Sequence, residues 1–306
     1  MASASGSASP PGPAPWRAAF LKNVNDMASP EFTLATLHSA SAGGVSSTVP
    51  RLRTVIFRGL WASLPVNPKN TAPLNPPIYE SDLLTLTTDA RMAKVPDLFG
   101  SATGSFSSGG GGPIEACFWT SAKVQWRVRG EAHVLGPDIE QRDAPGATAV
   151  RETLRARMRR VSDAEAQRRR REDLPEGKAE EASTAVANDE DDEGWSFARE
   201  VTAHFGNLSP AMRGTFRNPE PGTPRKANPA DGEHRLGQKV EDLHDDVARA
   251  NFRVVVIVPT EVDETDLSDP EDPRRWLYRF VGASADCRPP DGAERSNGWE
   301  KIELWP

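Results

Sequence analysis

The chain has 306 residues and carries 37 Lys and Arg against 44 Asp and Glu, a formal net charge of −7 at pH 7. This acidic balance argues against a nucleic-acid-binding protein, and two cysteines are too few for a disulfide framework or a zinc site. No apolar run approaches the ~20 residues that span a bilayer, and the N-terminus lacks the pattern of a secretion signal, so we expect no membrane association and a cytoplasmic location.

The distribution of Gly, Pro and charge predicts one folded domain with unstructured parts. Residues 1–14 are mostly Ser, Ala, Pro and Gly, so we expect a disordered tail followed by a single domain over residues 15–306. Within the domain we expect a charged, disordered insertion at about 138–193, because the sequence from residue 151 changes from strongly basic to strongly acidic with hardly any apolar stripe. A second, polar loop is expected at about 219–243.

The first expected element is an amphipathic helix that begins near Pro15. Trp16, Phe20, Leu21 and Val24 recur in it at helical spacing, and Pro15 suits the first turn. A second helix is expected within GWSFAREVTAHFGNL, after the charged insertion.

Most of the other elements are expected to be strands, because runs of β-branched and aromatic residues alternate with turn-forming Gly, Pro, Asn and Asp. These strands are expected at residues 32–37, 52–60, 83–88, 115–121, 124–135, 252–259, 275–282 and 299–304. Only Ala122 and Lys123 separate two of them, which predicts an antiparallel hairpin. The sequence therefore predicts a mainly β protein, an antiparallel barrel with flanking helices.

Two arginines flank an apolar run in the segment RLRTVIFRG. Arg53 and Arg58 would lie on opposite faces of a regular strand, so they can reach one ligand only if one of them lies at a strand end or bulge. The alternative is that both are ordinary outward-facing strand residues.

The segment TTDARMAK, residues 87–94, combines hydroxyls, a helix-capping acid and two cations. Thr87 and Thr88 end a predicted strand, Asp89 is a candidate cap, and Arg91 and Lys94 would lie one helical turn apart. Free backbone N–H groups at a helix start, together with an Arg fork and a Lys charge, suit a phosphate. The alternative is a capped helix with a cationic solvent face.

The strand VQWRVRGE, residues 124–131, has two chemically different faces. Gln125 and Arg127 share one face with Arg129, while Trp126 and Val128 share the other. Such a strand can bury its Trp side and offer an amide and a cation to the polar edge of a ring. The alternative is an edge strand with a charged outer face.

The order of these segments resembles the pyridoxamine 5′-phosphate oxidase-like split-barrel family. Within it, the chain is similar to the branch of FMN-binding-domain proteins whose text includes PWR, PRxRTVxFRG and LSPxMRxxFxxPxPGxP. Those motifs are matched here by Pro15 to Arg17, by Pro50 to Gly59, and by LSPAMRGTFRNPEPGTP at residues 208–224. The resemblance implies an antiparallel split β-barrel that binds FMN, in a groove between the two subunits of a homodimer.

The resemblance also implies roles for individual residues. Arg53 and Arg58 are expected to contact FMN from the first core strand, and Thr87 and Thr88 to contact the flavin or its ribityl chain. Arg91 and Lys94 are expected to bind the phosphate. Gln125 is expected to approach the isoalloxazine from the partner subunit's side, supported by Arg127.

The chain also departs from the family pattern. Met92-Ala93-Lys94 replaces the usual Ser-Arg-Lys, so one hydroxyl and one cation are absent, and Arg91 is the expected substitute. Near the C-terminus, VPTEVDETDL lacks the expected Trp, and Arg274-Arg275-Trp276 matches the substrate motif of true pyridoxamine-phosphate oxidases only loosely. The resemblance therefore implies an FMN-binding relative that is not a true pyridoxamine-phosphate oxidase, with an unidentified substrate.

Three functions are compatible with these features. The first is an FMN-dependent oxidoreductase acting on an unidentified small molecule, in which the flavin and not a side chain performs the chemistry. The second is a flavin-binding protein without catalytic activity. The third is an interaction protein that works through the charged insertion. No metal cluster or nucleophile elbow is recognisable in the sequence. The GGGG at residues 109–112 is not a P-loop, because Lys and Ser or Thr do not follow it.

Overall fold

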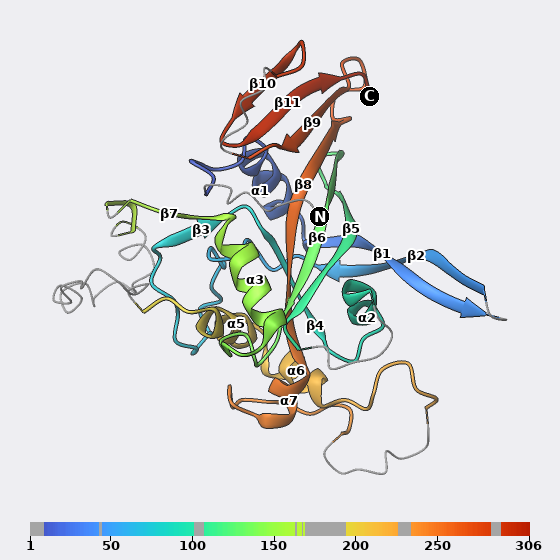
Figure 1. Ribbon diagram of the computed structural model, residues 1–306, viewed down its shortest axis with the longest axis vertical. Helices are drawn as coiled ribbons and strands as arrows, with labels where there is room; N and C mark the ends of the chain where they lie inside the picture. The colour runs from blue at the N-terminus through green and yellow to red at the C-terminus, as the bar shows by residue number, and fades with distance from the viewer. Residues whose placement is uncertain are drawn as a thin grey trace.

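The computed structural model describes residues 9–42, 45–100, 107–162, 164–166, 168, 194–225, 234–282 and 289–306. Figure 1 shows a long, twisted β-sheet running through the molecule, with helices on both sides of it and at one end. No helix in these ranges is long and apolar enough to cross a membrane.

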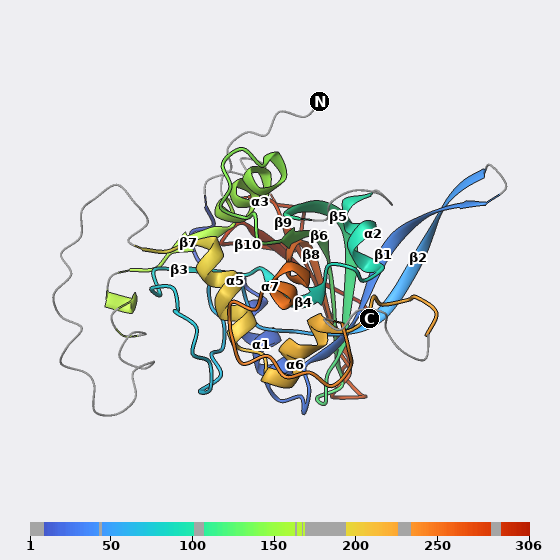
Figure 2. The same cartoon turned by 90° about the horizontal axis from the view of Figure 1, so that it is seen from below.

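Nine antiparallel strands form the main sheet, in the order β10-β11-β9-β8-β6-β5-β1-β2, with β4 also paired to β8. Their bounds are β1 Glu31–Ala42, β2 Val45–Ile56, β4 Leu84–Asp89, β5 Gly109–Trp119, β6 Val124–Leu135, β8 Phe252–Asp266, β9 Arg274–Phe280, β10 Ala293–Ser296 and β11 Trp299–Leu304. Each of the eight strands expected from the sequence is present. The β1–β2 hairpin extends well beyond the body of the molecule (Figure 2).

Side chains from β1, β4, β5, β6, β8, β9 and β11 share one hydrophobic core, and the sheet around it is a split barrel. The strand path itself is open, and the segment that follows β2 bridges the gap to β4: Arg58 N donates to Thr85 O at 2.8 Å, and Trp61 N donates to Leu83 O at 2.9 Å. On the other side, β8 pairs with β4 and β6 along its first half and with β6 and β9 along its second. The fold is therefore mainly antiparallel β with flanking helices, as the sequence predicts.

The split occurs where β8 passes a bulge. The pairing of β6 with β8 shifts register between Arg129 and Gly130, which lets the long strand change partners. A Cβ built on Gly130 would lie 2.0 Å from Val258 O, so only glycine permits this close approach.

Helix α1, Arg17–Asn25, closes one end of the barrel with aromatic side chains. The ring of Phe20 makes edge-to-face contacts with Phe57, Phe118 and Trp126, at centroid distances of 5.6, 5.1 and 5.6 Å. Trp126 Nε1 donates to Asn23 Oδ1 at 2.9 Å, which satisfies its buried polar atom. The amphipathic spacing at the N-terminus thus produces the expected helix and its buried face.

A second core lies on the other face of β8. Val254, Val256 and Val258 face the helices, whereas Val255 and Ile257 face the barrel interior. Burial on both faces explains why this strand reads as a continuous apolar run. The remaining described helices and the small second sheet are α2 Lys94–Phe99, α3 Pro145–Arg155, α5 Phe197–Gly206, α6 Pro210–Gly214, η1 Thr215–Arg217, α7 Asp246–Asn251, β3 Tyr79–Ser81 and β7 Met158–Arg160.

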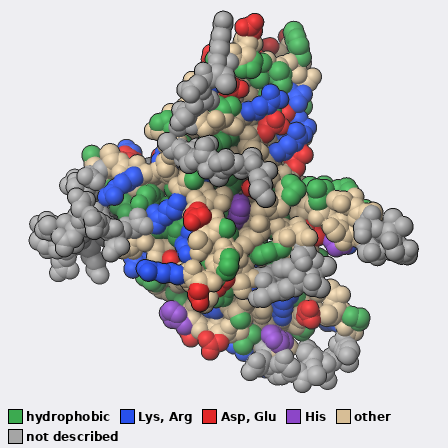
Figure 3. Space-filling model, viewed as in Figure 1, with side chains coloured by type: hydrophobic (Ala, Val, Ile, Leu, Met, Phe, Trp, Pro, Cys, Tyr) green, Lys and Arg blue, Asp and Glu red, His purple; other side chains and the backbone are tan. Residues whose placement is uncertain are grey.

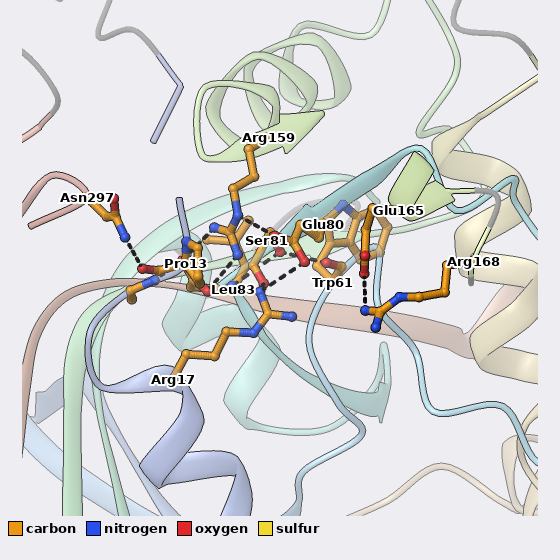
Figure 4. A network of polar contacts seen from close by, with 12 residues as sticks. Pro13, Arg17, Trp61, Glu80, Ser81, Leu83, Arg159, Glu165, Arg168 and Asn297 are labelled. Carbon is orange, nitrogen blue, oxygen red and sulfur yellow. Dashed lines mark hydrogen bonds and ion pairs between the residues drawn. The ribbon is translucent and has the colours of Figure 1, made fainter. Parts of the chain in front are cut away.

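A buried ion-pair network joins the N-terminal segment to the small sheet formed by β3 and β7. Asp82 accepts from Ala14 N at 3.0 Å, from Arg17 at 3.2 Å and from both terminal nitrogens of Arg159, at 2.7 and 3.1 Å. Glu80 accepts from Arg159 Nε at 2.7 Å. Figure 4 shows the two arginines reaching the network from opposite sides.

The structure differs from the expected domain layout in part. Residues 145–160, which the sequence assigns to the charged insertion, form α3 and β7 and bury Val150, Leu154 and Met158. Ala14, at the end of the expected tail, is buried as well. Most of residues 163–193 lies outside the described residues.

Candidate functional site

A groove of about 1160 Å³ lies between the barrel and the segment that follows α5. One side, here called the barrel wall, includes Thr54, Val55, Arg58, Thr87, Thr88 and Lys94. The opposite side, here called the outer wall, comprises the groove-lining residues between 208 and 236, among them Leu208, Met212, Phe216, Asn218, Pro221 and Leu236. Four of the eight residues singled out by sequence therefore line one groove.

Arg58 enters the groove because it lies just past the end of β2. Gly59 follows with φ 106°, and a Cβ there would lie 2.3 Å from Pro65 Cδ, so the chain turns sharply at this point. Arg58 Nε is buried and has no hydrogen-bond partner among the described residues. Burial lowers the pKa of Arg58. A desolvated guanidinium with an unused donor is a strong candidate ligand for an anion.

Lys94 provides a second buried cation on the barrel wall. Its side chain is about 9% exposed, and Nζ donates to Thr88 Oγ1 at 2.8 Å. The pKa of Lys94 is lowered to about 8, mainly by burial and then by repulsion from Arg53, against a smaller opposing effect of Asp89. The charge on Lys94 is therefore poorly compensated by the protein alone.

Arg53 lies near Lys94 but does not line the groove. Its guanidinium donates to Thr36 Oγ1 at 2.7 Å and pairs with Asp97 at 3.4 Å. Asp97 is buried, and its carboxylate also accepts a hydrogen bond from Thr36 Oγ1 at 2.6 Å. His38 Nδ1 lies 2.7 Å from the other carboxylate oxygen of Asp97. Burial lowers the pKa of Arg53, and Asp97 partly opposes this effect. Arg53 thus adds positive charge behind Lys94 from β2.

Arg91 supports the outer wall in this structure. Its guanidinium forms a bidentate pair with Asp89, at 2.9 and 2.7 Å, and donates to the carbonyls of Asn218 and Phe216 at 3.0 and 3.3 Å. Asp89 also accepts from Arg91 N at 2.8 Å, which forms a turn, and α2 begins only at Lys94. Arg91 and Lys94 therefore do not share a helix, and Arg91 points toward backbone carbonyls.

The outer wall is the part of the site whose role the sequence did not indicate. In the sequence these residues are part of a motif without an assigned role, yet Phe216 packs edge-to-face on Phe252 at 5.1 Å, and Asn251 Nδ2 donates to Phe216 O at 2.9 Å. Arg217 pairs with Asp245 at 2.5 Å. These contacts fasten a Pro-rich segment beside β4, and only the tertiary structure reveals them.

Gln125 and Arg127 lie on another surface of the chain. Residues 124–128 alternate between buried and partly exposed positions, so Gln125 and Arg127 share the outer face of β6 as expected. Gln125 Oε1 is 3.6 Å from Cys117 Sγ, and Arg127 pairs with Asp263 at 2.7 Å. Neither residue lines the groove of its own chain.

Asp263 holds a second arginine on this outer face. Arg275 of β9 donates to its carboxylate at 2.7 Å, and together with Arg127 it keeps the pKa of Asp263 below its ordinary value against the opposing effect of burial. Figure 3 shows cationic and acidic side chains intermixed over the upper part of the molecule, where β8 and β9 lie. Within the described ranges, no cluster of three His, Cys, Asp or Glu side chains could hold a metal ion.

Comparisons with known proteins bear on the barrel half of this site. Residues 13–136 match the sequence model of the family described as pyridoxamine 5′-phosphate oxidase, FMN-binding domain. No curated protein sequence matches the chain. The matched segment contains Arg58, Thr87, Thr88 and Lys94, whereas the outer wall lies beyond it.

Two solved structures align with most of the chain at low similarity. A pyridoxamine 5′-phosphate oxidase-related, FMN binding protein from Nostoc punctiforme PCC 73102 is 18% identical, with 96% of this chain and 100% of that chain covered and a TM-score of 0.48. PhzG from Burkholderia lata 383, in complex with tetrahydrophenazine-1-carboxylic acid, is 13% identical, with coverages of 94% and 87% and a TM-score of 0.31. Both alignments are too distant to add to the family match. The similarity that the comparisons show is thus that of residues 13–136 to the FMN-binding domain of the pyridoxamine 5′-phosphate oxidase family.

Proposed function

We propose that the protein binds FMN in this groove and acts as an FMN-dependent oxidoreductase on a small molecule. The observation that carries the proposal is the pair of desolvated cations on the barrel wall, Arg58 and Lys94. Arg58 Nε lacks a partner among the described residues, and Lys94 donates to a single hydroxyl there. Both cations gain the compensation that they lack when a phosphate binds.

The residues of the groove fit the chemistry of this cofactor. A phosphate dianion needs several cations and hydroxyl or N–H donors, which Lys94, Arg58 and Thr88 provide, with Arg53 adding positive charge from behind. The larger part of the groove surface is apolar, as a planar ring requires. The hydride chemistry belongs to the flavin when it is bound, and the protein binds and orients it and excludes water.

Arg91 is the residue whose predicted role is most altered by the surrounding contacts. The sequence predicts that it binds the phosphate, while its guanidinium here holds Asp89 and two carbonyls of the outer wall. We propose that Arg91 acts on the cofactor mainly by holding the outer wall in place.

In a homodimer, Gln125 and Arg127 would be able to contact the flavin bound by the partner subunit. Gln125 and Arg127 lie on an outer face of the sheet, away from their own groove, so they can reach a flavin only across a subunit boundary. This arrangement and a cytoplasmic location remain predictions. Light scattering on the purified protein measures the oligomeric state directly.

The visible spectrum of the purified protein tests the proposal. We expect a yellow protein with about one FMN per chain, and a loss of most bound FMN in the double variant Arg58→Ala, Lys94→Ala. The matched control is Arg129→Ala, which removes a cation whose side chain is 53% exposed and should leave FMN content unchanged. Full FMN content in a folded double variant would refute the assignment of the groove.

Catalysis is tested separately from binding. Reduction of the bound flavin by NADH or NADPH, followed by reoxidation with a panel of acceptors, is expected if the protein is an oxidoreductase. A protein that holds FMN tightly but is neither reduced nor reoxidised on a useful timescale would instead be a flavin-binding protein without catalytic activity.

A further inference from the structure

A second, smaller cavity of about 220 Å³ lies beside α5. Its lining includes none of the residues that line the groove described above. Most of the lining residues are apolar and include Leu64, Leu74, Pro76, Pro77 and Trp195, while Ser63, Asn75 and Glu200 are polar, and polar and apolar atoms share the cavity surface about equally.

The loop that covers this cavity is fastened to α5 by asparagines. Asn75 exchanges two hydrogen bonds with the backbone of Ser196, at 2.9 and 3.0 Å, and Asn70 Nδ2 donates to Ala203 O at 2.9 Å. Asn207 Nδ2 donates to Pro65 O at 2.9 Å. These bonds hold both ends of the loop, so the cavity is a preformed feature of the fold.

Glu200 provides a buried carboxyl group in the cavity lining. Its side chain is only 4% exposed, and Oε2 accepts from Asn75 Nδ2 at 2.8 Å. The backbone of Ala62 also donates to this carboxyl group, and burial raises the pKa of Glu200 despite both bonds. A carboxylate has about four acceptor positions, so two bonds leave it able to accept more.

Ser63 provides an independent indication that a ligand fits here. Its hydroxyl oxygen is buried and has no hydrogen-bond partner among the described residues. A buried hydroxyl without a hydrogen-bond partner costs free energy, and the cavity beside Ser63 has room for a ligand that supplies such a partner.

We propose that this cavity binds a small organic cation, a primary ammonium group on an apolar body. Among the described residues that line the cavity, Glu200 has the only ionisable side chain, so a carboxylate there favours a positive partner. Ser63 accepts a further hydrogen bond from the ammonium group, and the Leu, Pro and Trp walls surround the body. Arg155 already stacks over the ring of Trp195 at 4.8 Å, so cations are tolerated beside this wall. The proposal does not depend on flavin binding.

Titration calorimetry with benzylammonium and its neutral analogue benzyl alcohol tests the proposal on the full-length protein. We expect saturable binding of benzylammonium and at least about tenfold weaker binding of benzyl alcohol, the difference that one unpaired charge interaction typically makes. Equal affinities would mean that the site is merely apolar and would overturn the proposal, as would the absence of saturable benzylammonium binding at millimolar concentration.

Two variants and one control make the test specific. Glu200→Gln keeps the shape and an oxygen for Asn75, and it is expected to reduce benzylammonium affinity to that of benzyl alcohol. The matched control is Glu140→Gln, because Glu140 is an exposed acid that accepts from Ala198 N of the same helix at 3.0 Å but lies outside the cavity lining. Unchanged affinity in Glu200→Gln would overturn the proposal.

A substitution at the mouth of the cavity keeps the test valid if Glu200→Gln does not fold. Leu74 lines the cavity and is 40% exposed, so Leu74→Lys is expected to fold and to offer Glu200 an internal ammonium group. That variant should lose benzylammonium binding. Wild-type affinity in Leu74→Lys would contradict the proposed site.

Discussion

At the scale of single residues, Lys94 shows how burial prepares a side chain for a ligand. Its pKa of about 8, lowered mainly by burial, means that the protein is near the limit of keeping it charged. Thr88 is its hydrogen-bond partner, and Arg53 repels it from behind. A bound phosphate would restore the missing compensation, so proton and phosphate binding at Lys94 must be linked.

The first prediction concerns the pH dependence of FMN affinity. Without FMN, Lys94 loses its proton as the pH rises through about 8, whereas a bound phosphate raises its pKa. The affinity for FMN is therefore expected to be highest below pH 8 and to fall by up to about tenfold per pH unit above it. Equilibrium titrations between pH 7 and 9 measure this, because the phosphate itself titrates near pH 6.

Lys94→Arg is the matched control for this prediction. An arginine keeps its charge throughout this range, so its FMN affinity should change little with pH. A wild-type affinity that is as flat as that of the variant would show that Lys94 does not meet the phosphate.

At the scale of elements, α5 carries two buried titratable groups one turn apart, Glu200 and His204. The pKa of His204 is lowered to about 3, first by burial and then by Arg58, and its ring stacks on Trp61 at 6.0 Å. The Nε2 atom has no partner among the described residues. The folded protein therefore keeps His204 neutral far below the pH at which an exposed histidine becomes charged.

The second prediction is that His204 destabilises the fold in acid. The pKa of His204 in the folded protein lies below its unfolded value of 6.5. The contribution of neutral His204 to the free energy of unfolding is therefore fully present above pH 6.5 and is lost as the pH falls toward 3. The expected loss for this group is of the order of 4 kcal/mol in the free energy of unfolding. Urea unfolding between pH 4 and 7 measures it.

His204→Phe separates this effect from other titrations. The phenyl ring keeps the stack on Trp61 and cannot be protonated, so the variant should lose less stability between pH 7 and 4 than the wild type. His133, whose pKa burial also lowers, contributes to both proteins equally. Parallel pH profiles would show that His204 does not control the acid response.

Strands were easier to predict from the sequence than helices, for a physical reason. The bounds of β6 were predicted without error, because Trp126 and Val128 alternate with polar residues in a half-buried strand. The packing of helix α3 is not predictable in the same way, because its buried Val150 and Leu154 are separated by Arg and Glu and resemble a solvated segment. Its burial depends on contacts with β5 and β6, which the residue pattern within the helix does not reveal.

The candidate site was predictable to the same limited degree. Cations and hydroxyls at strand ends indicated the barrel wall, since polar groups in such places commonly serve a ligand. The outer wall could not be assigned a role, because its position depends on tertiary contacts such as that of Arg91 with the Phe216 carbonyl. Likewise, nothing in the local sequence pattern shows that the guanidinium of Arg91 pairs with the carboxylate of Asp89.

At the scale of the whole molecule, the network around Asp82 fastens distant segments together. It joins the chain near Ala14 and Arg17 to β7 through Arg159, and Asn297 Nδ2 reaches back to Pro13 O at 2.7 Å. The N-terminal segment is thereby tied both to β7 and to the turn between β10 and β11 (Figure 4).

The third prediction is that this network is essential for stability. Asp82→Asn removes the charge that compensates Arg159, which is only 7% exposed, so the free energy of unfolding should fall by about 3 kcal/mol. Urea denaturation measures the change. The matched control is Glu165→Gln, which breaks the more exposed pair with Arg168 at 2.9 Å and should cost less than about 1 kcal/mol. Equal effects of the two substitutions would contradict the importance of the buried network.

The position of β8 has a consequence for anyone who wishes to shorten the protein. A fragment ending at residue 136 would retain the whole segment that matches the family, yet it would leave β4 and β6 without the strand that lies between them. Two bare strand edges and an uncovered apolar interior favour aggregation. The boundary that homology suggests is thus no boundary for folding, and an expression fragment needs to extend at least through residue 266.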